Sequence, residues 1–295
     1  MKNTFQRCAA RIVLIIPFAA FLYSPSVALA VPILNSAQNF AVLGGAGVAI
    51  NGTGSVITGS VGSCCGSAAV TGSGFTDSDG TVYYSAGSVT NTAHNDLLAA
   101  TSALNGLGPG TTETSLDNIT LGPGVYTSSD TNFTGTLTLN GEGNANALWV
   151  FLFPSSLTTA SSSNVIVENA GAGAGVYWVV GSSADLGSNS VFAGNILANT
   201  AAANTGTNIT DCGRLLTETA SVTLAGNDAI GIGNCSGNLA NSSGLSGGGT
   251  LVNGTFVAAA YVSNGQVPEP GTVPLLCGGF LALTLFGWQS RKRVA

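Results

Sequence analysis

Two kinds of short segment alternate along the middle of the chain. The first kind is an unbroken apolar run, as in ALWVFLF at 147–153 and GVYWVVG at 175–181. The second kind alternates apolar and small polar residues, as in LTTASSSN at 157–164 and VTLAGNDA at 222–229. Successive segments of the second kind start about twenty residues apart, which is typical of a chain that winds once per coil of a β-solenoid.

The two patterns predict different surroundings for the two kinds of strand. Strict alternation places one side of a strand in the core and the other in water, with Leu157 inward and Thr158 outward. A strand that is apolar on both sides must be covered on both sides. We therefore expect Trp149, Phe151 and Phe153 in the interior, and Leu148, Val150 and Leu152 under a second layer.

One segment has the spacing needed for that second layer. In NTAHNDLLAATSALNGLG at 91–108, four apolar residues recur at helical intervals, namely Ala93, Leu97, Ala100 and Leu104. Thr90 or Asn91 is expected to cap the start, and Gly106 or Gly108 the end. The chain is thus predicted to be mainly β, with one long α-helix packed alongside. His94 is expected at the surface or on a side of this helix, and no catalytic role is expected for it.

The charge pattern excludes several classes of function. Only seven residues are Lys or Arg, and six of these lie at the two ends, so Arg214 is the single basic residue of the body. Nucleic-acid binding needs clustered cations and is excluded. The acidic residues are scattered, and no nucleophile–base motif appears. We expect no enzymatic activity, no cofactor and no metal site.

The two ends have the features of targeting segments. Residues 1–30 combine basic residues, the apolar run IVLIIPFAAFLY and Ala28-Leu29-Ala30, which predicts a cleaved signal peptide. Near the other end, Pro268, Glu269 and Pro270 precede the apolar run 273–288 and then RKR at 291–293. Residues 267–295 resemble the bacterial PEP-CTERM sorting tail. The alternative is a plain C-terminal membrane anchor.

The targeting segments imply an exported protein, at the cell surface or outside the cell. The resemblance to PEP-CTERM tails implies recognition by an exosortase-type membrane protease, which removes the transmembrane helix. Membrane contact is then expected only through that helix, before processing. We assign the folded domain to residues 31–235, and the Gly- and Ser-rich residues 236–266 are predicted to be a flexible linker.

Four cysteines remain once those of the targeting segments are set aside. An exported protein can hold disulfide bonds, and four cysteines allow three pairings. The spacing of Cys212 and Cys235 is close to one coil, which favours a bond between neighbouring coils. The adjacent Cys64 and Cys65 either bond to each other in a strained ring or pair elsewhere. A zinc site made by all four is disfavoured because no CxxC spacing is present.

Several stretches resemble one known family, the microbial ice-binding β-helix proteins. They include NFAVLGGAGVAINGTGSVITGSVG at 39–62, GTLTLNGEGNANALWVF at 135–151, FAGNILA at 192–198 and CGRLLTETASVTL at 212–224. The resemblance spans about residues 33–230. It implies a discontinuous right-handed β-helix of triangular section with a long helix alongside, and adsorption to ice through one flat face. The alternative is a cell-surface adhesin or matrix protein on the same fold.

The family's ice face often carries Thr, then Ala or Gly, then any residue, then Thr or Asn. Thr205-Gly206-Thr207-Asn208 matches this pattern, whereas Asp185 and Ala202 interrupt the outward rows. Thr138, Thr158, Thr205 and Thr223 are expected to form one outward row. The implied partners are the ice surface and ordered water, and the full set of candidate residues is Thr138, Asn140, Thr158, Ser161, Ser163, Ser188, Ser190, Asn204, Thr205, Thr207, Asn208 and Thr223.

Overall fold

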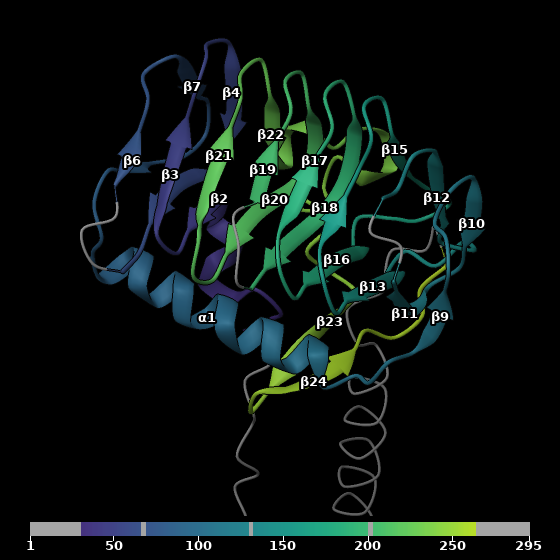
Figure 1. Ribbon diagram of the computed structural model, residues 1–295. Helices are drawn as coiled ribbons and strands as arrows, with labels where there is room; N and C mark the ends of the chain where they lie inside the picture. Colours follow the sequence, from purple (N-terminus) through teal and green to yellow (C-terminus); the bar gives the residue numbers. More distant parts are fainter. Residues whose placement is uncertain (1–30, 66–68, 130–131, 200–202, 264–295) are drawn as a thin grey trace, which may run out of the picture.

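Short parallel strands wind into a solenoid with one long α-helix at its side (Figure 1). The computed structural model describes residues 31–65, 69–129, 132–199 and 203–263. The strands form three faces, which we name the helix-covered face, the short-strand face and the third face. The mainly β fold with one long helix is therefore confirmed. Its right-handed winding stays a prediction.

The helix-covered face contains the unbroken apolar strands. Its members are β9 (Thr111–Glu113), β11 (Gly124–Ser128), β13 (Leu148–Phe153), β16 (Gly175–Val180), the second halves of β18 (Val191–Ala198) and β20 (Thr210–Thr217), β2 (Phe40–Gly44), β5 (Ser60–Ser63) and β8 (Val82–Tyr83).

The short-strand face and the third face complete the coils. The short-strand face consists of β14 (Leu157–Thr158), β17 (Ala184–Leu186), β19 (Ala203–Thr205), β21 (Ser221–Leu224), β3 (Gly47–Ile50) and β6 (Val70–Thr71). The third face consists of β10 (Ile119–Leu121), β12 (Thr136–Asn140), β15 (Asn164–Glu168), the first halves of β18 and β20, β22 (Ala229–Gly231), β4 (Ser55–Thr58) and β7 (Phe75–Asp77).

The order of coils in space differs from their order in the sequence. β2 pairs with β20, β3 with β21 and β4 with β22, so the N-terminal coils stack on the last C-terminal coil. In Figure 1 the purple and blue strands accordingly lie beside the green ones. Between the two groups the chain follows α1 (Ser88–Asn105) along the solenoid before it winds back. This arrangement confirms the expected discontinuity.

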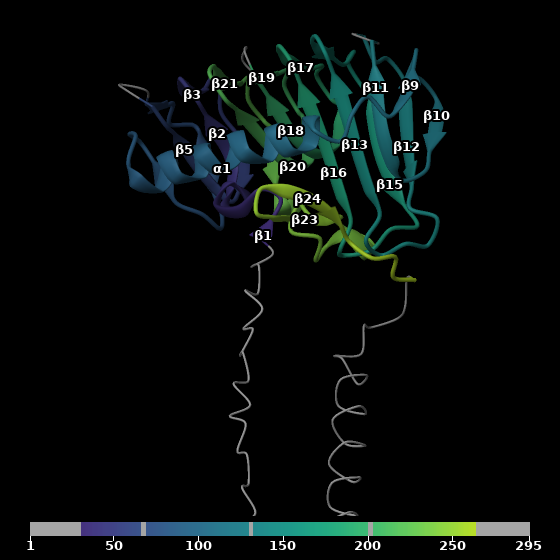
Figure 2. The same ribbon diagram turned by 90° about the horizontal axis from the view of Figure 1, so that it is seen from below.

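The buried side chains confirm the two strand patterns. Trp149, Phe151 and Phe153 fill the interior, where the rings of Phe151 and Trp178 stack with centroids 4.1 Å apart. Val150 and Leu152 face outward and belong to a second apolar cluster. That cluster includes all four predicted helix residues, Ala93, Leu97, Ala100 and Leu104, and α1 lies over this face (Figure 2).

The start of the helix differs from the prediction. Gly87, rather than Thr90 or Asn91, is the N-cap, and its backbone N–H donates to Thr90 Oγ1 at 2.9 Å. Thr90 therefore lies inside the first turn, where its hydroxyl satisfies a backbone donor that precedes the helix. The end agrees with the prediction, because Gly106 is the C-cap.

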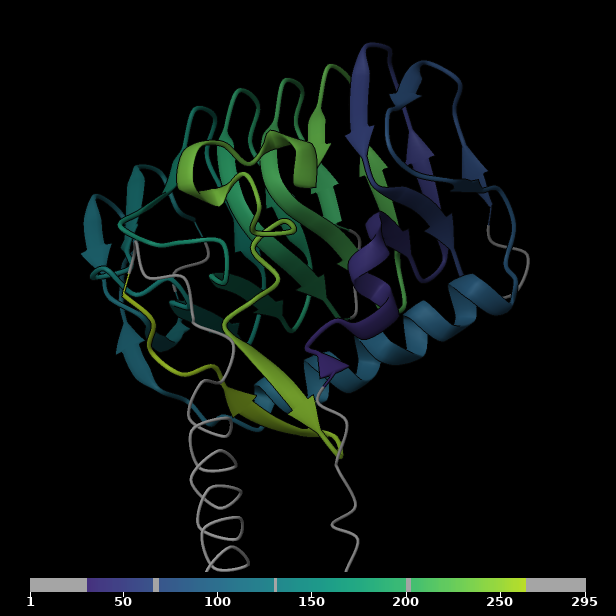
Figure 3. The same cartoon turned by 180° about the vertical axis from the view of Figure 1, so that it is seen from behind.

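The segment predicted to be a flexible linker is packed against the solenoid instead. Residues 232–248 run across the back of the solenoid (Figure 3), through η2 (Ile232–Asn234) and η3 (Gly237–Leu239). β23 (Gly249–Val252) and β24 (Thr255–Ala258) then lie at the lower edge of the solenoid beside α1 (Figure 1), where Phe256 packs against the second apolar cluster. β23 also pairs with β1 (Val31–Pro32), which is followed by η1 (Asn35–Asn39). Leu245 is fully buried. The linker prediction is therefore wrong for the described part of 236–266.

Arg214 holds this segment in place. Arg214 is 1% exposed, and its guanidinium donates to the backbone oxygens of Gln38, Ser243 and Gly244 and to Asn195 Oδ1, at 2.6–3.1 Å. One side chain thus joins the N-terminal segment, the coil stack and the C-terminal segment. Its burial is offset by these hydrogen bonds rather than by a paired carboxylate.

The described residues contain the disulfide bonds Cys212–Cys235 and Cys64–Cys65. Cys212 in β20 is bonded to Cys235, which confirms the predicted pair. Cys235 follows η2, so the bond joins a coil to the C-terminal segment rather than two coils. Cys64 and Cys65 are bonded to each other, one of the alternatives left open by the sequence.

Arg214→Met should destabilise the protein by about 3–5 kcal/mol, because it leaves several buried acceptors without a donor. Chemical denaturation of the two proteins would measure the difference. A loss below about 1 kcal/mol, the level of ordinary surface changes, would show that Arg214 does not hold the segment.

Candidate functional site

One outward row runs along the short-strand face over six coils. Backbone register places Thr158 beside Asp185, Asp185 beside Asn204, and Asn204 beside Thr223. Ala49 and Thr71 of the N-terminal coils continue the same row. The residues just before these positions, such as Leu157 and Val222, are buried. The row is therefore the solvent side of this face.

The flanks of the row are made of small residues. Two positions back along the strands lie Ser156, Ser183 and Ser221, and two positions forward lie Ala160, Gly187 and Ala225, all partly exposed. Because each side chain is short, none of these rows stands much above its neighbour. Asp185 is the single ionisable residue of the central row. The result is an even surface that is almost without charge.

The corner between this face and the third face explains the matched motif. Each coil turns there through a residue of positive φ, namely Ser162 (64°), Asn189 (60°), Asn208 (59°) and Asn227 (55°). Asn tolerates this left-handed conformation better than other residues with a side chain. Asn208 Nδ2 also donates to Asn189 Oδ1 at 3.0 Å. The turn therefore favours the Asn of the motif, although Ser162 adopts the same conformation in one coil.

Three hydroxyl candidates lie at this corner. Ser161 and Thr207 are exposed and Ser188 is partly exposed. Thr207 N donates to Ser188 Oγ at 3.1 Å, so successive coils are in contact here. The corner thereby extends the hydroxyl-bearing surface of the short-strand face. Thr158 and Thr223 are partly exposed within the face, and Asn204 shares their row by register.

Five candidate residues lie outside the central row and the exposed corner. Ser163 and Ser190 are each 1% exposed, and both donate to Ala160 O. By backbone register Thr205 pairs with Leu186 and is therefore not a member of the row that contains Thr158 and Thr223. Thr138 and Asn140 lie in β12 on the third face. The predicted single row of Thr138, Thr158, Thr205 and Thr223 is therefore wrong, because the alternating pattern does not distinguish one face from another.

The sequence interpretation missed the two coils that lengthen the row. Ala49 and Thr71 precede the helix in the sequence, yet they follow Thr223 in space. The alternating stretch GVAING at 47–52 was the available signal. The spacing of about twenty residues between coils does not identify this stretch as part of the row, because the stacking joins segments more than 150 residues apart in the sequence.

A groove beside the third face lacks the paired groups that acid–base catalysis requires. A groove of about 430 Å³ lies between the third face and residues 234–239, and Glu168 is its single titratable residue apart from the bonded cysteines. A pair of acid and base groups is absent from its lining. One group of three metal-ligating side chains, Cys64, Cys65 and His94, lies elsewhere among the described residues.

Asp211 is the carboxylate with the most perturbed environment. It is fully buried, both its oxygens lack a hydrogen-bond partner, and its register neighbours are Phe192 and Ile230. Burial raises the pKa of Asp211 to about 8, against the opposing effect of Arg214. A shifted pKa can mark a catalytic group, but this carboxyl is closed off from substrate. It is instead a buried, protonated acid.

The folded protein therefore keeps a proton on Asp211 that the unfolded chain releases above its ordinary pKa. Stability should fall as pH rises from about 4 to about 8 and then level off. Asp211→Asn should remove this slope while changing stability at pH 4 by less than about 1 kcal/mol. Urea denaturation across this pH range is the measurement. An unchanged slope in the variant would contradict the assignment.

Comparisons with known proteins agree with this architecture. The profile of the family described as ice-binding-like matches residues 42–230. The chain belongs to the ice-binding-like family. An ice-binding protein of Nostoc sp. (strain HG1) is 42% identical over 225 residues, covering 74% of this chain and 81% of that protein. The proteins of this family are not enzymes, in agreement with the expectation from the sequence.

Solved structures show the same fold. The ice-binding protein of the Antarctic ascomycete Antarctomyces psychrotrophicus matches with a TM-score of 0.60 and 32% identity, over 67% of this chain and 96% of that one. An ice-binding protein from an Antarctic biological consortium matches with a TM-score of 0.61 and 28% identity, over 68% and 90% of the two chains. Both comparisons support the solenoid arrangement described above.

Proposed function

We propose that this protein adsorbs to ice through the short-strand face and the corner that follows it. The observation that carries the proposal is the row of Thr158, Asp185, Asn204, Thr223, Ala49 and Thr71, held in one register over six coils. Membership of the ice-binding-like family supports the same function.

The physical basis is the regular spacing of the coils. Parallel strands repeat at about 4.7–4.9 Å, so equivalent side chains form a lattice. Threonine methyl groups restrict the neighbouring water, while the hydroxyls hold it by hydrogen bonds. Water ordered in this way can join the surface of an ice crystal. Few charges are present to impose another arrangement on it.

Asp185 is the feature of the row that fits this mechanism least. It lies between Thr158 and Asn204, and an ionised carboxylate binds water strongly in its own geometry. We therefore expect ice adsorption of moderate rather than extreme strength. The adhesin interpretation is the less favoured one, because the relatives that match most of this chain are ice-binding proteins.

We also propose that the protein is exported and sorted to the cell surface. The predicted signal peptide at 1–30 and the sorting segment at 267–295, with Pro268, Glu269 and Pro270, support this and lie outside the described residues. Among the described residues, no helix is long and apolar enough to span a membrane. An exosortase-type protease remains the proposed processing partner.

Thr158→Tyr should sharply reduce inhibition of ice recrystallisation, because a protruding ring breaks the evenness of the face. Folding should be nearly unaffected, since exposed substitutions usually cost less than about 0.5 kcal/mol. Thr223→Tyr, two coils beyond Asp185, should have the same effect. Recrystallisation inhibition and thermal melting would be measured side by side for each variant.

Two control variants test whether the effect depends on the face that carries the substitution. Thr138→Tyr places the same ring on the third face and should leave recrystallisation inhibition unchanged. Leu157→Ala removes a buried side chain and should lower stability by about 2–5 kcal/mol. If Thr138→Tyr abolishes the activity and Thr158→Tyr does not, the ice-binding surface lies on the third face.

The sorting proposal predicts two cuts in the exported chain. Mass spectrometry of the surface protein should show an N-terminus at Val31 and a C-terminus near Pro268–Pro270. Recovery of the uncut chain from the cytoplasm would contradict it.

A further inference from the structure

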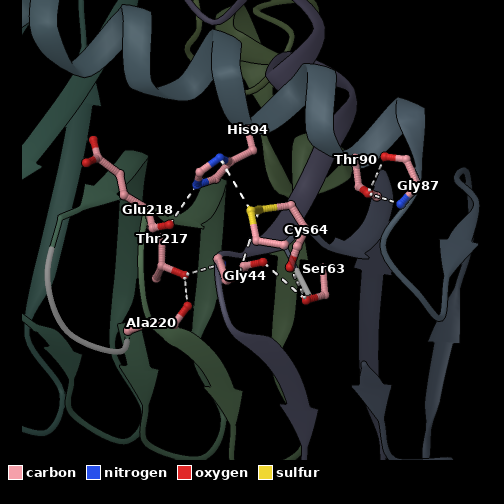
Figure 4. Close-up of a disulfide and its surroundings, with 11 residues drawn as sticks. Gly44, Ser63, Cys64, Gly87, Thr90, His94, Thr217, Glu218 and Ala220 are labelled. Carbon is pink, nitrogen blue, oxygen red and sulfur yellow. Dashed lines mark hydrogen bonds between the residues drawn. A yellow bond between two sulfur atoms is a disulfide. The ribbon is translucent and has the colours of Figure 1, made fainter. Parts of the chain in front are cut away.

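A small cluster of sulfur and nitrogen atoms lies where α1 meets the N-terminal coils. Cys64 and Cys65 follow β5 and are bonded to each other, and His94 reaches them from α1 (Figure 4). One ligand atom from each of the three residues lies within 4.8 Å of the others. Cys65 Sγ and His94 Nδ1 are 3.8 Å apart. The ice-binding proposal uses none of these residues.

The imidazole of His94 is held in one tautomer. Its Nε2 lies 2.6 Å from the backbone oxygen of Glu218, which can only accept a hydrogen bond. Nε2 therefore carries the proton in the neutral ring, and the lone pair of Nδ1 faces the sulfur atoms. A metal-ligating histidine is typically oriented in this way, with its other ring N–H donated to a carbonyl or a carboxylate.

We propose that the reduced form of this cluster is a binding site for a divalent ion of the zinc class, with Cys64 Sγ, Cys65 Sγ and His94 Nδ1 as ligands. The site is created by a dithiol reductant, which gives two electrons and two protons to the Cys64–Cys65 bond and itself becomes a cyclic disulfide. Binding of the ion then releases the two thiol protons. In the oxidised form the sulfur atoms are bonded to each other and the site is closed.

The geometry needs only a local adjustment. With Zn–S about 2.3 Å and Zn–N about 2.0–2.1 Å in a tetrahedron, sulfur and nitrogen ligands lie roughly 3.5 Å apart, and two sulfurs roughly 3.8 Å apart. The separation of Cys65 Sγ and His94 Nδ1 is already close to that value. After reduction, rotation of the exposed Cys65 side chain separates the two sulfurs.

The surroundings favour one class of ion and provide access. Two thiolates and one imidazole suit zinc and cadmium rather than calcium or magnesium, which prefer oxygen ligands. Cys64 is buried, whereas Cys65 is exposed and leaves a path for entry. Three protein ligands leave a fourth position for water. Because His94 belongs to α1 and the cysteines to a coil, a bound ion would join the helix to the solenoid.

The test is titration of the exported chain, which starts at Val31 and lacks Cys8 and Cys277, with Cd²⁺ in the presence and absence of a dithiol reductant, monitored by the ultraviolet thiolate-to-cadmium charge-transfer band. We expect the reduced protein to bind one ion in this site and the oxidised protein to bind none. Zn²⁺ in excess should compete with Cd²⁺ for the site. Either ion should raise the melting temperature of the reduced protein, because folding brings His94 to the two cysteines and the folded state therefore binds the ion more tightly than the unfolded chain.

Three variants make the result decisive. Cys65→Ser should abolish the band, and His94→Gln should weaken Cd²⁺ binding more than about tenfold. Cys212→Ser combined with Cys235→Ser removes the other disulfide and should retain the band. A band that survives in Cys65→Ser, or that is lost with Cys212 and Cys235, would overturn the proposal, as would equal affinity in His94→Gln.

Discussion

The parallel register between the first and the last coils is the constraint on which the rest of the structure depends. Leu215 pairs with Val42, Val222 with Val48 and Ile230 with Ile57, so all three faces are continued across the junction. A shift of one residue would exchange the inward and outward side chains of these strands. The outward row, the cover provided by α1 and the contacts of Arg214 all require this one alignment.

Much of the fold was predictable because its signals are local. The alternation around Leu157 and the apolar run 147–153 define which side chains are buried, and helical spacing identifies α1. The docking of residues 236–263 was not predictable from composition. Their Gly and Ser content resembles that of a linker, whereas the contacts that fix them are backbone oxygens of Ser243 and Gly244 accepting from Arg214. Every residue has a backbone carbonyl oxygen, so the sequence does not indicate which of them accept these hydrogen bonds.

The candidate surface was only partly predictable, for a related reason. A period of two identifies outward residues but not the face on which they lie, so Thr138 was grouped with Thr158 although they belong to different faces. Ser163 and Ser190 follow the tight corner, where the alternation is broken by a residue of positive φ and their hydroxyls turn inward. The register of neighbouring coils, which only the structure supplies, decides these assignments.

Adsorption of the intact folded protein to ice is tested most directly by growing a single-crystal ice hemisphere from a solution of fluorescently labelled protein. If the short-strand face binds ice, fluorescence should be incorporated into the ice on defined crystal planes. This incorporation should disappear when the label is carried by the Thr158→Tyr variant. Ice that grows clear, with all of the wild-type protein rejected into the liquid, would show that the protein does not bind ice.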